Sequence, residues 1–338
     1  MVDGQHYNFI LNKIPHIAVI GAGELGSRHL QGLSRITHDI NITVIEPNIV
    51  SINTAKKRYN EMPTNSSVRT ISYFESIKSF TCDVDVAIIA TNADIRRKVV
   101  EDLLEKVDVK YLILEKVAFQ SIQDFEIVME LLEKKNTKGW VNCTRRIYPF
   151  FRSLRQNTIQ EKKITMDVRG SNWGLASNAI HMVDLFSFLT EQKEVTIDAS
   201  NLDKKIYQSE RQGFIELGGR LIAQTSRGDI LHILDNRKTT VSHLMKIETD
   251  NQEIEIYQRK ILYRSSQKNR EKQSKELPFF IPLQSEVTHL IVEEILQTGN
   301  SELTNIKESY NIHKPLIEAF NEHLSDINGK PYRVCPIT

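Results

Sequence analysis

Short apolar runs alternate with helical patterns from Ile17 to about Val141, and this alternation constrains the fold more than any other feature of the sequence. The runs are almost wholly apolar, which is typical of parallel strands that are buried on both faces. The segments between them carry apolar residues at helical spacing, for example Ile95, Val99 and Leu103. We therefore expect a doubly wound parallel sheet covered by helices. Its strands are expected at 16–20, 42–46, 69–73, 84–91, 111–115 and 140–142.

The pattern changes after Arg145. A helical stretch at 148–156 and a strand at 164–170 precede a helix that is expected to begin near Asn178. From Val195 to Tyr263 the sequence consists of strand patterns separated by turn residues, which predicts a mostly antiparallel sheet. The polar stretch 264–276 is expected to be a mobile loop, and two amphipathic helices close the chain. This half is therefore expected to be an α+β domain with a large, open-faced sheet.

The length of 338 residues is more than one hydrophobic core usually organises, so two domains are expected. We place the first at residues 1–143 and the second at 144–330, followed by a C-terminal tail at 331–338 that returns over the structure. The net charge of +1 offers no field that would attract nucleic acid or an anionic membrane, so neither is expected as a partner.

The three cysteines, Cys82, Cys143 and Cys335, are widely spaced and form no CxxC pair. They favour a reducing compartment over a disulfide-bonded protein, and no metal site is expected. The N-terminal residues lack the basic and apolar regions of a signal peptide, and no apolar window is long enough to span a membrane. We therefore expect a cytoplasmic protein.

The strongest motif is IAVIGAGELGSRHL, in which Gly21, Gly23 and Gly26 form GxGxxG between an apolar strand and a helix. The first glycine allows a tight turn, the second lets the backbone approach a pyrophosphate, and the third lets helix and strand pack closely. The helix N-terminus also attracts the anion. The motif predicts a Rossmann domain with a dinucleotide site, and Glu24 and Leu25 belong to the same predicted loop. A Rossmann-like fold with a vestigial pocket is the alternative.

Glu46 lies 20 residues after Gly26 at the end of the second strand, where an acid accepts hydrogen bonds from the adenosine ribose. A carboxylate there repels a 2′-phosphate, and no Lys or Arg follows until Lys56, so NAD is favoured over NADP. Thr91 and Asn92 follow the fourth strand at its carboxyl end, where ligands of such sheets bind. They are expected to line the nicotinamide side, although a polar loop explains them nearly as well.

At this point the sequence resembles the glucose–fructose oxidoreductase/inositol dehydrogenase (Gfo/Idh/MocA) family. Five segments carry the likeness in the family's order: GAGELGSRHL, VDVAIIATNAD, YLILEK, VNCTRRIYPF and NAIHMVDL. The resemblance implies that the Rossmann domain binds NAD or NADP and that the open-faced sheet mediates oligomers. It also implies hydride transfer at a carbon of a sugar or cyclitol.

The resemblance assigns the catalytic lysine to Lys116, which follows Glu115 at the end of a strand. The family's Glu-Lys-Pro reads Glu-Lys-Val here, and Glu115 is placed among the cofactor-binding residues. Burial and a neighbouring nicotinamide cation both lower a lysine pKa, which suits a group that holds a proton near neutral pH. The alternative is a lysine that merely reaches solvent.

The resemblance also assigns a catalytic histidine to His181, which is expected to share or relay the proton. Asp184 matches the pattern at i+3 and is expected to orient His181, although it could equally stabilise the first turns of the helix. Ser177 stands where the family has an aspartate, four residues before the histidine, and the adjacent Asn178 is out of register. The substitution removes the carboxylate that, by the resemblance, would assist the proton relay at His181.

Several residues near the domain junction are candidate substrate ligands. A guanidinium at Arg145 or Arg146 is expected to bind a carboxylate or phosphate, while one of the pair forms an interdomain salt bridge. The full set of predicted substrate-binding residues is Arg145, Tyr148, Trp173, Asn178 and Arg211.

These features together predict an NAD-dependent oxidoreductase acting on a secondary alcohol or ketone of a sugar derivative, such as a nucleotide sugar or sugar acid of surface polysaccharides. The uncovered sheet face predicts a homodimer or homotetramer. The alternatives are an NADP-dependent reductase and a non-catalytic NAD-binding sensor, because a fold does not fix a function.

Overall fold

The parallel sheet predicted for the first half of the chain is present in the computed structural model, which describes residues 13–158, 163–265 and 274–338. Its strand order is β3-β2-β1-β4-β5-β6-β17, and all neighbours are parallel except the short edge strand β17. Nearly every side chain of β1 and β4 is apolar and buried, as expected for central strands. The strands are β1 (His16–Ile20), β2 (Ile40–Ile45), β3 (Val68–Phe74), β4 (Val84–Ile89), β5 (Val109–Leu114), β6 (Lys138–Val141) and β17 (Thr304–Asn305).

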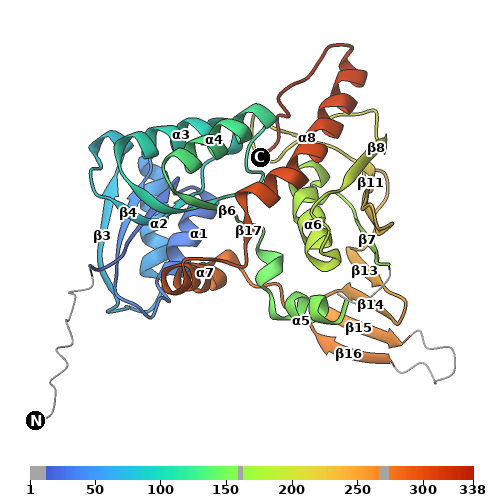
Figure 1. Cartoon of the computed structure of the whole chain (residues 1–338), viewed down its shortest axis with the longest axis horizontal. Helices are drawn as coiled ribbons and strands as arrows, with labels where there is room; N and C mark the ends of the chain where they lie inside the picture. The colour runs from blue at the N-terminus through green and yellow to red at the C-terminus, as the bar shows by residue number, and fades with distance from the viewer. Residues whose placement is uncertain (1–12, 159–162, 266–273) are drawn as a thin grey trace, which may run out of the picture.

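Helices cover both faces of this sheet. Figure 1 shows α3 and α4 on one side and α1, α2 and α7 on the other. This is the doubly wound arrangement that the alternating pattern predicted. The helices are α1 (Glu24–Leu33), α2 (Ile49–Asn60), α3 (Ala93–Lys106), α4 (Ile122–Lys134) and α7 (Gln284–Thr298), with a short 3-10 helix, η1 (Ile77–Ser79), after β3.

The second sheet has the strand order β16-β15-β14-β13-β7-β12-β11-β8. Only β7 and β12 pair in parallel among its described neighbours, so the predicted mostly antiparallel sheet is confirmed. The strands are β7 (Thr165–Gly170), β8 (Thr196–Leu202), β11 (Gly219–Gln224), β12 (Ile230–Asp235), β13 (Leu244–Glu248), β14 (Gln252–Tyr257), β15 (Lys260–Ser265) and β16 (Ser274–Pro278).

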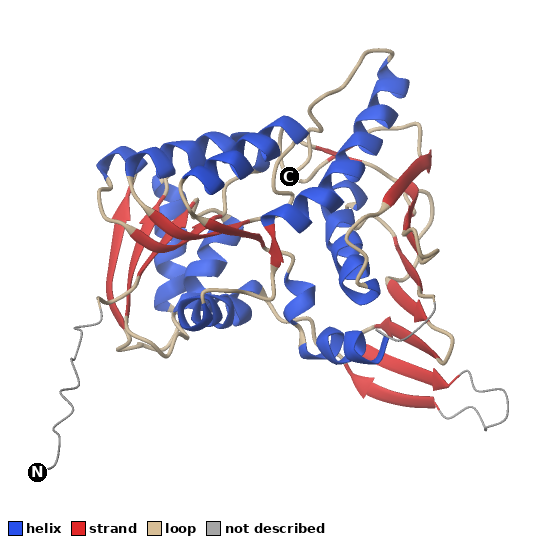
Figure 2. Ribbon diagram, viewed as in Figure 1, coloured by secondary structure: helices blue, strands red, loops and turns tan. Residues whose placement is uncertain are grey.

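Helices cover the inner face of this second sheet. In Figure 2, α6 (Leu175–Thr190) and α8 (Ile306–Asn328) lie between the two sheets, and no helix of the described residues covers the outer face. The outward side chains are mixed. Ile222 and Ile230 are half-buried and apolar, whereas Lys246 further along the sheet forms ion pairs with Glu248 and Glu253.

The C-terminal part of the chain returns to the first domain. α7 packs against α1, β17 pairs with β6, and α8 contacts elements of both domains. The final residues lie between the domains: the Cys335 amide donates to the Gln120 carbonyl at 2.8 Å, and the Ile215 amide donates to the Pro336 carbonyl at 2.9 Å. A division at residue 143 therefore assigns every strand but β17 to the domain of its own sheet. Residues after 283, however, contribute to both domains.

Three local expectations are corrected. The loop expected at 264–276 is wrong at both ends, because its first residues belong to β15 and its last to β16; residues 266–273 lie outside the described residues. The helix expected near Asn178 begins at Leu175, after Gly174 in a left-handed conformation. Among the strand patterns expected from Val195 to Tyr263, the run GFIELGG at 213–219 forms only the short β10 (Ile215–Glu216) before β11 begins, and β10 forms a hairpin with β9 (Tyr207–Gln208).

Two short helices connect the domains, η2 (Thr144–Ile147) and α5 (Pro149–Thr158). Across the described ranges, none of the helices combines the length and the apolar character needed to cross a membrane.

Candidate active site

The glycine loop after β1 closes tightly against the end of β4. Gly21 has a φ of +86°, and a Cβ on it would lie 2.9 Å from the Thr91 amide nitrogen. A Cβ on Gly26 would lie 1.7 Å from the carbonyl oxygen of Gly21, so only glycine fits there. A Cβ on Gly23, in contrast, would meet nothing within 4 Å, and Gly23 precedes α1 without a capping side chain. The open space at a helix N-terminus therefore fits a pyrophosphate.

A groove of about 790 Å³ runs along this edge of the sheet. Glu46 lies in its wall, with one carboxylate oxygen accepting from the Ala22 amide at 2.7 Å and the other from the Asn48 amide at 2.9 Å. These contacts fix the carboxylate beside the glycine loop, where it suits the hydroxyls of a ribose. The residues of this structure therefore fit a dinucleotide. Predicted residues that line the groove are Gly21, Gly23, Glu46, Thr91 and Asn92.

Apart from Gly26, three residues that were predicted to bind the cofactor do not line the groove. Glu24 is exposed and its carboxylate binds Arg58 at 2.6 Å, while Leu25 is half-buried at the start of α1. Glu115 is buried, and it accepts hydrogen bonds from His29 at 2.8 Å and from Asn142 at 2.5 Å. Burial alone would raise the pKa of Glu115, but these two hydrogen bonds, together with the electrostatic effects of His29 and Arg96, outweigh burial and lower the pKa. Its contacts are those of a structural carboxylate that joins α1 to β6.

Arg96 was missed by the sequence reasoning. Its guanidinium is fully buried and donates to the carbonyls of Thr91, Glu115, Val117 and Ala118, so one side chain joins the loops that follow β4 and β5. Burial lowers the pKa of Arg96 to about 10. The helical spacing of the sequence could have indicated that Arg96 is buried. It lies one turn before Val100 on the face of α3 that also carries the buried Leu103 and Leu104.

Lys116 follows β5 and extends toward the start of α6. Its Nζ atom donates to the Ser177 carbonyl at 3.0 Å and to Oδ1 of Asn178 at 3.2 Å. The Lys116–Val117 peptide bond is cis. Burial lowers the pKa of Lys116 to about 8, and the nearby cations of Arg211 and Arg145 act in the same direction.

His181 lies on α6 near Lys116. It is half-buried, and its Nδ1 atom is buried without a hydrogen-bond partner among the described residues. Burial lowers its pKa well below the usual value, and the positive charges of Arg145 and Lys116 lower it further. The imidazole is therefore neutral at neutral pH.

Asp184 requires a correction. Its carboxylate is fully buried and accepts from Nε of Arg146 at 2.8 Å and from the Thr304 hydroxyl. Within the described part of the chain it makes no hydrogen bond to His181, so the expected orienting contact is not formed. Arg146 thus forms a buried salt bridge, but its partner lies in the same predicted domain (144–330), so this pair is not the interdomain bridge that was expected; Glu308 lies 3.7 Å from the same guanidinium.

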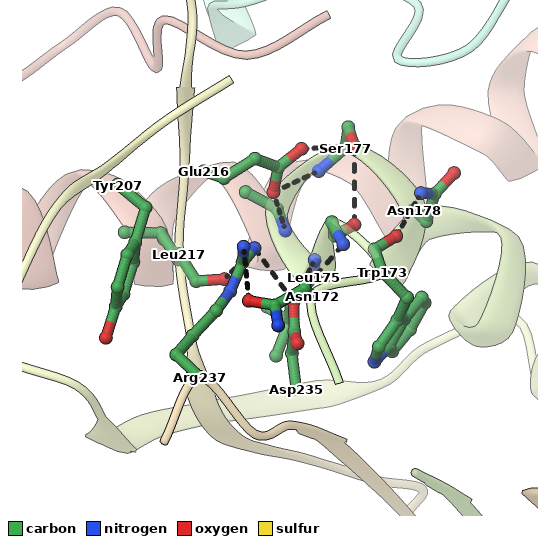
Figure 3. A network of polar contacts seen from close by, with 12 residues as sticks. Asn172, Trp173, Leu175, Ser177, Asn178, Tyr207, Glu216, Leu217, Asp235 and Arg237 are labelled. Carbon is green, nitrogen blue, oxygen red and sulfur yellow. Dashed lines mark hydrogen bonds and ion pairs between the residues drawn. The ribbon is translucent and has the colours of Figure 1, made fainter. Parts of the chain in front are cut away.

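Most of the predicted substrate residues converge on two neighbouring cavities. A polar pocket of about 370 Å³ is lined by Lys116, Trp173, Asn178 and Arg211, and also by Glu216 of β10, which the sequence reasoning did not identify. Figure 3 shows Glu216, Ser177 and Asn178 around the first turn of α6.

A second, more apolar cavity of about 700 Å³ is lined by Arg145 and Tyr148. The Arg145 guanidinium forms no ion pair or hydrogen bond within the ranges that the structure describes, and it is half-buried. Trp173 of the polar pocket and His243 of the second cavity are in edge-to-face contact, with ring centroids 5.8 Å apart.

Comparisons with known proteins agree with this geometry. Residues 16–143 match the GFO_IDH_MocA family, described as an oxidoreductase family with an NAD-binding Rossmann fold. No curated protein matches the chain in sequence.

Solved structures share the fold at low identity. UDP-N-acetylglucosamine 3-dehydrogenase GnnA from Acidithiobacillus ferrooxidans has a TM-score of 0.67 at 12% identity, covering 91% of this chain and 97% of that chain. A super-repressor mutant of Gal80p from Saccharomyces cerevisiae has a TM-score of 0.70 at 12% identity, with coverages of 96% and 98%. Biliverdin reductase from Synechocystis, in complex with biliverdin and NADP+, has a TM-score of 0.67 at 10% identity, with coverages of 90% and 97%. Residues 16–143 therefore carry the NAD-binding Rossmann domain of the Gfo/Idh/MocA oxidoreductase family.

Proposed function

We propose that the chain is an NAD-dependent oxidoreductase that moves hydride to or from a secondary alcohol or ketone carbon of an acidic sugar derivative. The observation that carries this proposal is Lys116, a half-buried lysine with a pKa of about 8 at the carboxyl edge of the parallel sheet. Such a group is partly neutral near physiological pH and can therefore accept or donate a proton.

The residues of the groove and of the reaction centre have separate tasks in this proposal. When bound, the dinucleotide supplies or accepts the hydride; the glycine loop holds its pyrophosphate and Glu46 its adenosine ribose. During oxidation, neutral Lys116 takes the proton from the substrate hydroxyl, and during reduction its ammonium group returns it. Neutral His181 accepts or passes on a hydrogen bond at the same centre.

The substrate class is inferred from the cations that face the cavities. Arg145 has no partner among the described residues and Arg211 faces Lys116, so a carboxylate or phosphate on the substrate would compensate both. The similarity of fold to a UDP-N-acetylglucosamine 3-dehydrogenase supports testing nucleotide sugars first. We further propose a cytoplasmic homodimer or homotetramer that associates through the outer face of the second sheet.

The test is a screen of nucleotide sugars and sugar acids for formation or consumption of NADH, followed by Lys116→Ala. This variant is expected to bind NAD(H) as the wild type does but to turn over about 10²–10⁴-fold more slowly. Lys110→Ala is the matched control, because Lys110 is an exposed lysine on β5, the strand that Lys116 follows. Undiminished turnover in Lys116→Ala contradicts the proposal.

A non-catalytic NAD-binding sensor is the second candidate. Ser177 in place of the family's aspartate and the engagement of Asp184 by Arg146 favour it, and the similar fold of Gal80p is compatible with it. Tight NAD binding without turnover of any screened substrate would decide for the sensor.

A further inference from the structure

The first turn of α6 is capped by two carboxylates from distant strands. Asp235 of β12 accepts from the amides of Gly174 and Leu175 at 3.2 and 3.3 Å. Glu216 of β10 accepts from the amides of Ala176 and Ser177 at 2.9 and 3.4 Å, and its other oxygen accepts from the Ser177 hydroxyl. Figure 3 shows both carboxylates at this helix start.

The two carboxylates differ in how their charge is balanced. Asp235 lies 2.8 Å from the Arg237 guanidinium. Glu216 is buried, and within the described residues it has no Lys or Arg ion pair; burial raises its pKa more than its hydrogen bonds and the nearby charge of Arg237 lower it. The gain from a negative charge at a helix N-terminus is smaller than the desolvation cost of a buried ion. A glutamine would accept the same amide hydrogens without that cost, so capping does not explain the charge of Glu216.

The position of Glu216 offers an explanation. Glu216 lines the same polar pocket as Lys116. Both side chains are hydrogen-bonded to Ser177: Lys116 donates to its carbonyl, and Glu216 accepts from its hydroxyl. Ser177 is the residue that replaces the family's aspartate four positions before His181. Position 177 lacks a carboxylate, but the Ser177 hydroxyl is hydrogen-bonded to the carboxylate of Glu216 on β10.

We propose that Ser177 and Glu216 together replace the missing aspartate of the reaction centre, with Glu216 as a positioning residue that acts through the Ser177 hydroxyl. Because that hydroxyl donates its hydrogen to Glu216, its lone pairs are directed to accept a hydrogen bond in the pocket. The group that donates to them is a second hydroxyl of the substrate, beside the reacting hydroxyl whose proton goes to Lys116. This inference rests on the proposed function.

The test transfers the carboxylate back to position 177. Glu216→Gln is expected to lower kcat by about 10–100-fold with little change in NAD affinity. In the double variant Ser177→Asp/Glu216→Gln most of the lost kcat returns, whereas Ser177→Asp alone places two carboxylates in contact and does not gain. Glu194→Gln is the matched control, because Glu194 is an exposed glutamate that lines neither cavity. A double variant no faster than Glu216→Gln overturns the proposal.

Thermal unfolding supplies a readout that needs no substrate. Glu216→Gln is expected to melt at the wild-type temperature or about 1–3 °C above it, because a buried charge has been removed. A lower melting temperature would assign the charge to helix capping and refute the inference even in an active enzyme. If the wild type binds NAD but converts no substrate, the proposed function has failed, and the melting comparison still decides whether the charge belongs to the cap.

Discussion

The pH dependence of the reaction follows from the lowered pKa of Lys116. With a pKa of about 8, about one tenth of Lys116 is neutral at pH 7, half at pH 8 and about nine tenths at pH 9. An unperturbed lysine, with a pKa of about 10.4, would be neutral in fewer than about one molecule in a thousand at pH 7. If neutral Lys116 accepts the proton, substrate oxidation should therefore accelerate about tenfold between pH 7 and 9 and level off above pH 8.

The two possible lysine states give different curves. An unperturbed lysine predicts a rise of about a hundredfold over the same interval and no plateau. Initial rates of NADH formation at saturating substrate measure the curve, and reduction should show the opposite slope because it uses the ammonium form. As a substrate-free check, lysines can be labelled by reductive ¹³C-methylation and titrated by NMR, with the Lys116 signal assigned by its loss in Lys116→Ala. A titration midpoint near pH 10, or a rate that keeps rising above pH 9, would refute the reasoning.

Three further predictions concern the cofactor, the buried ion pair and the assembly. Calorimetry should show NAD(H) binding at least about tenfold tighter than NADP(H), or about 1.4 kcal/mol, and Glu46→Ala should narrow this preference; equal affinities in the wild type would remove the role of Glu46. Asp184→Asn should lower the free energy of unfolding in urea by about 3–5 kcal/mol, because it leaves the Arg146 charge buried without its closest partner. Arg152→Gln, which breaks a surface pair, should cost about 1 kcal/mol or less; similar losses in both variants would contradict a structural role for Asp184. Light scattering should show a dimer or tetramer that Ile222→Arg weakens, and a wild-type monomer at micromolar concentration would rule out the proposed interface.

The architecture could be predicted from the sequence wherever burial imposes a pattern. The strands of the first sheet are buried on both faces, so apolar runs mark them within a few residues. The outer hairpin of β15 and β16 is different, because an edge hairpin needs few apolar residues. Lys260 and Glu276 form a 2.7 Å ion pair across it. Because the residues of this hairpin are largely polar and charged, their sequence was interpreted as a loop.

The positions of the candidate site residues were predictable where a motif carries its own geometry, as at Gly21, Gly26 and Lys116. Residues whose role depends on distant contacts were not. Glu216 lies in a strand-like run, and nothing local indicates that it reaches the start of α6. Asp184 has the spacing to face His181, but α6 is packed on several sides and that carboxylate instead meets Arg146.

The return of α7 and β17 to the first domain has a consequence for synthesis of the chain. Until residues 284–305 leave the ribosome, the β6 edge has no paired neighbour and the face of α1 that packs against α7 is uncovered. The first domain therefore cannot complete its folding while the second is being translated, although its first six strands come early. Contacts of such large sequence separation slow folding and prolong the exposure of apolar surface. A nascent chain of this protein is thus expected to depend on chaperones for most of its translation.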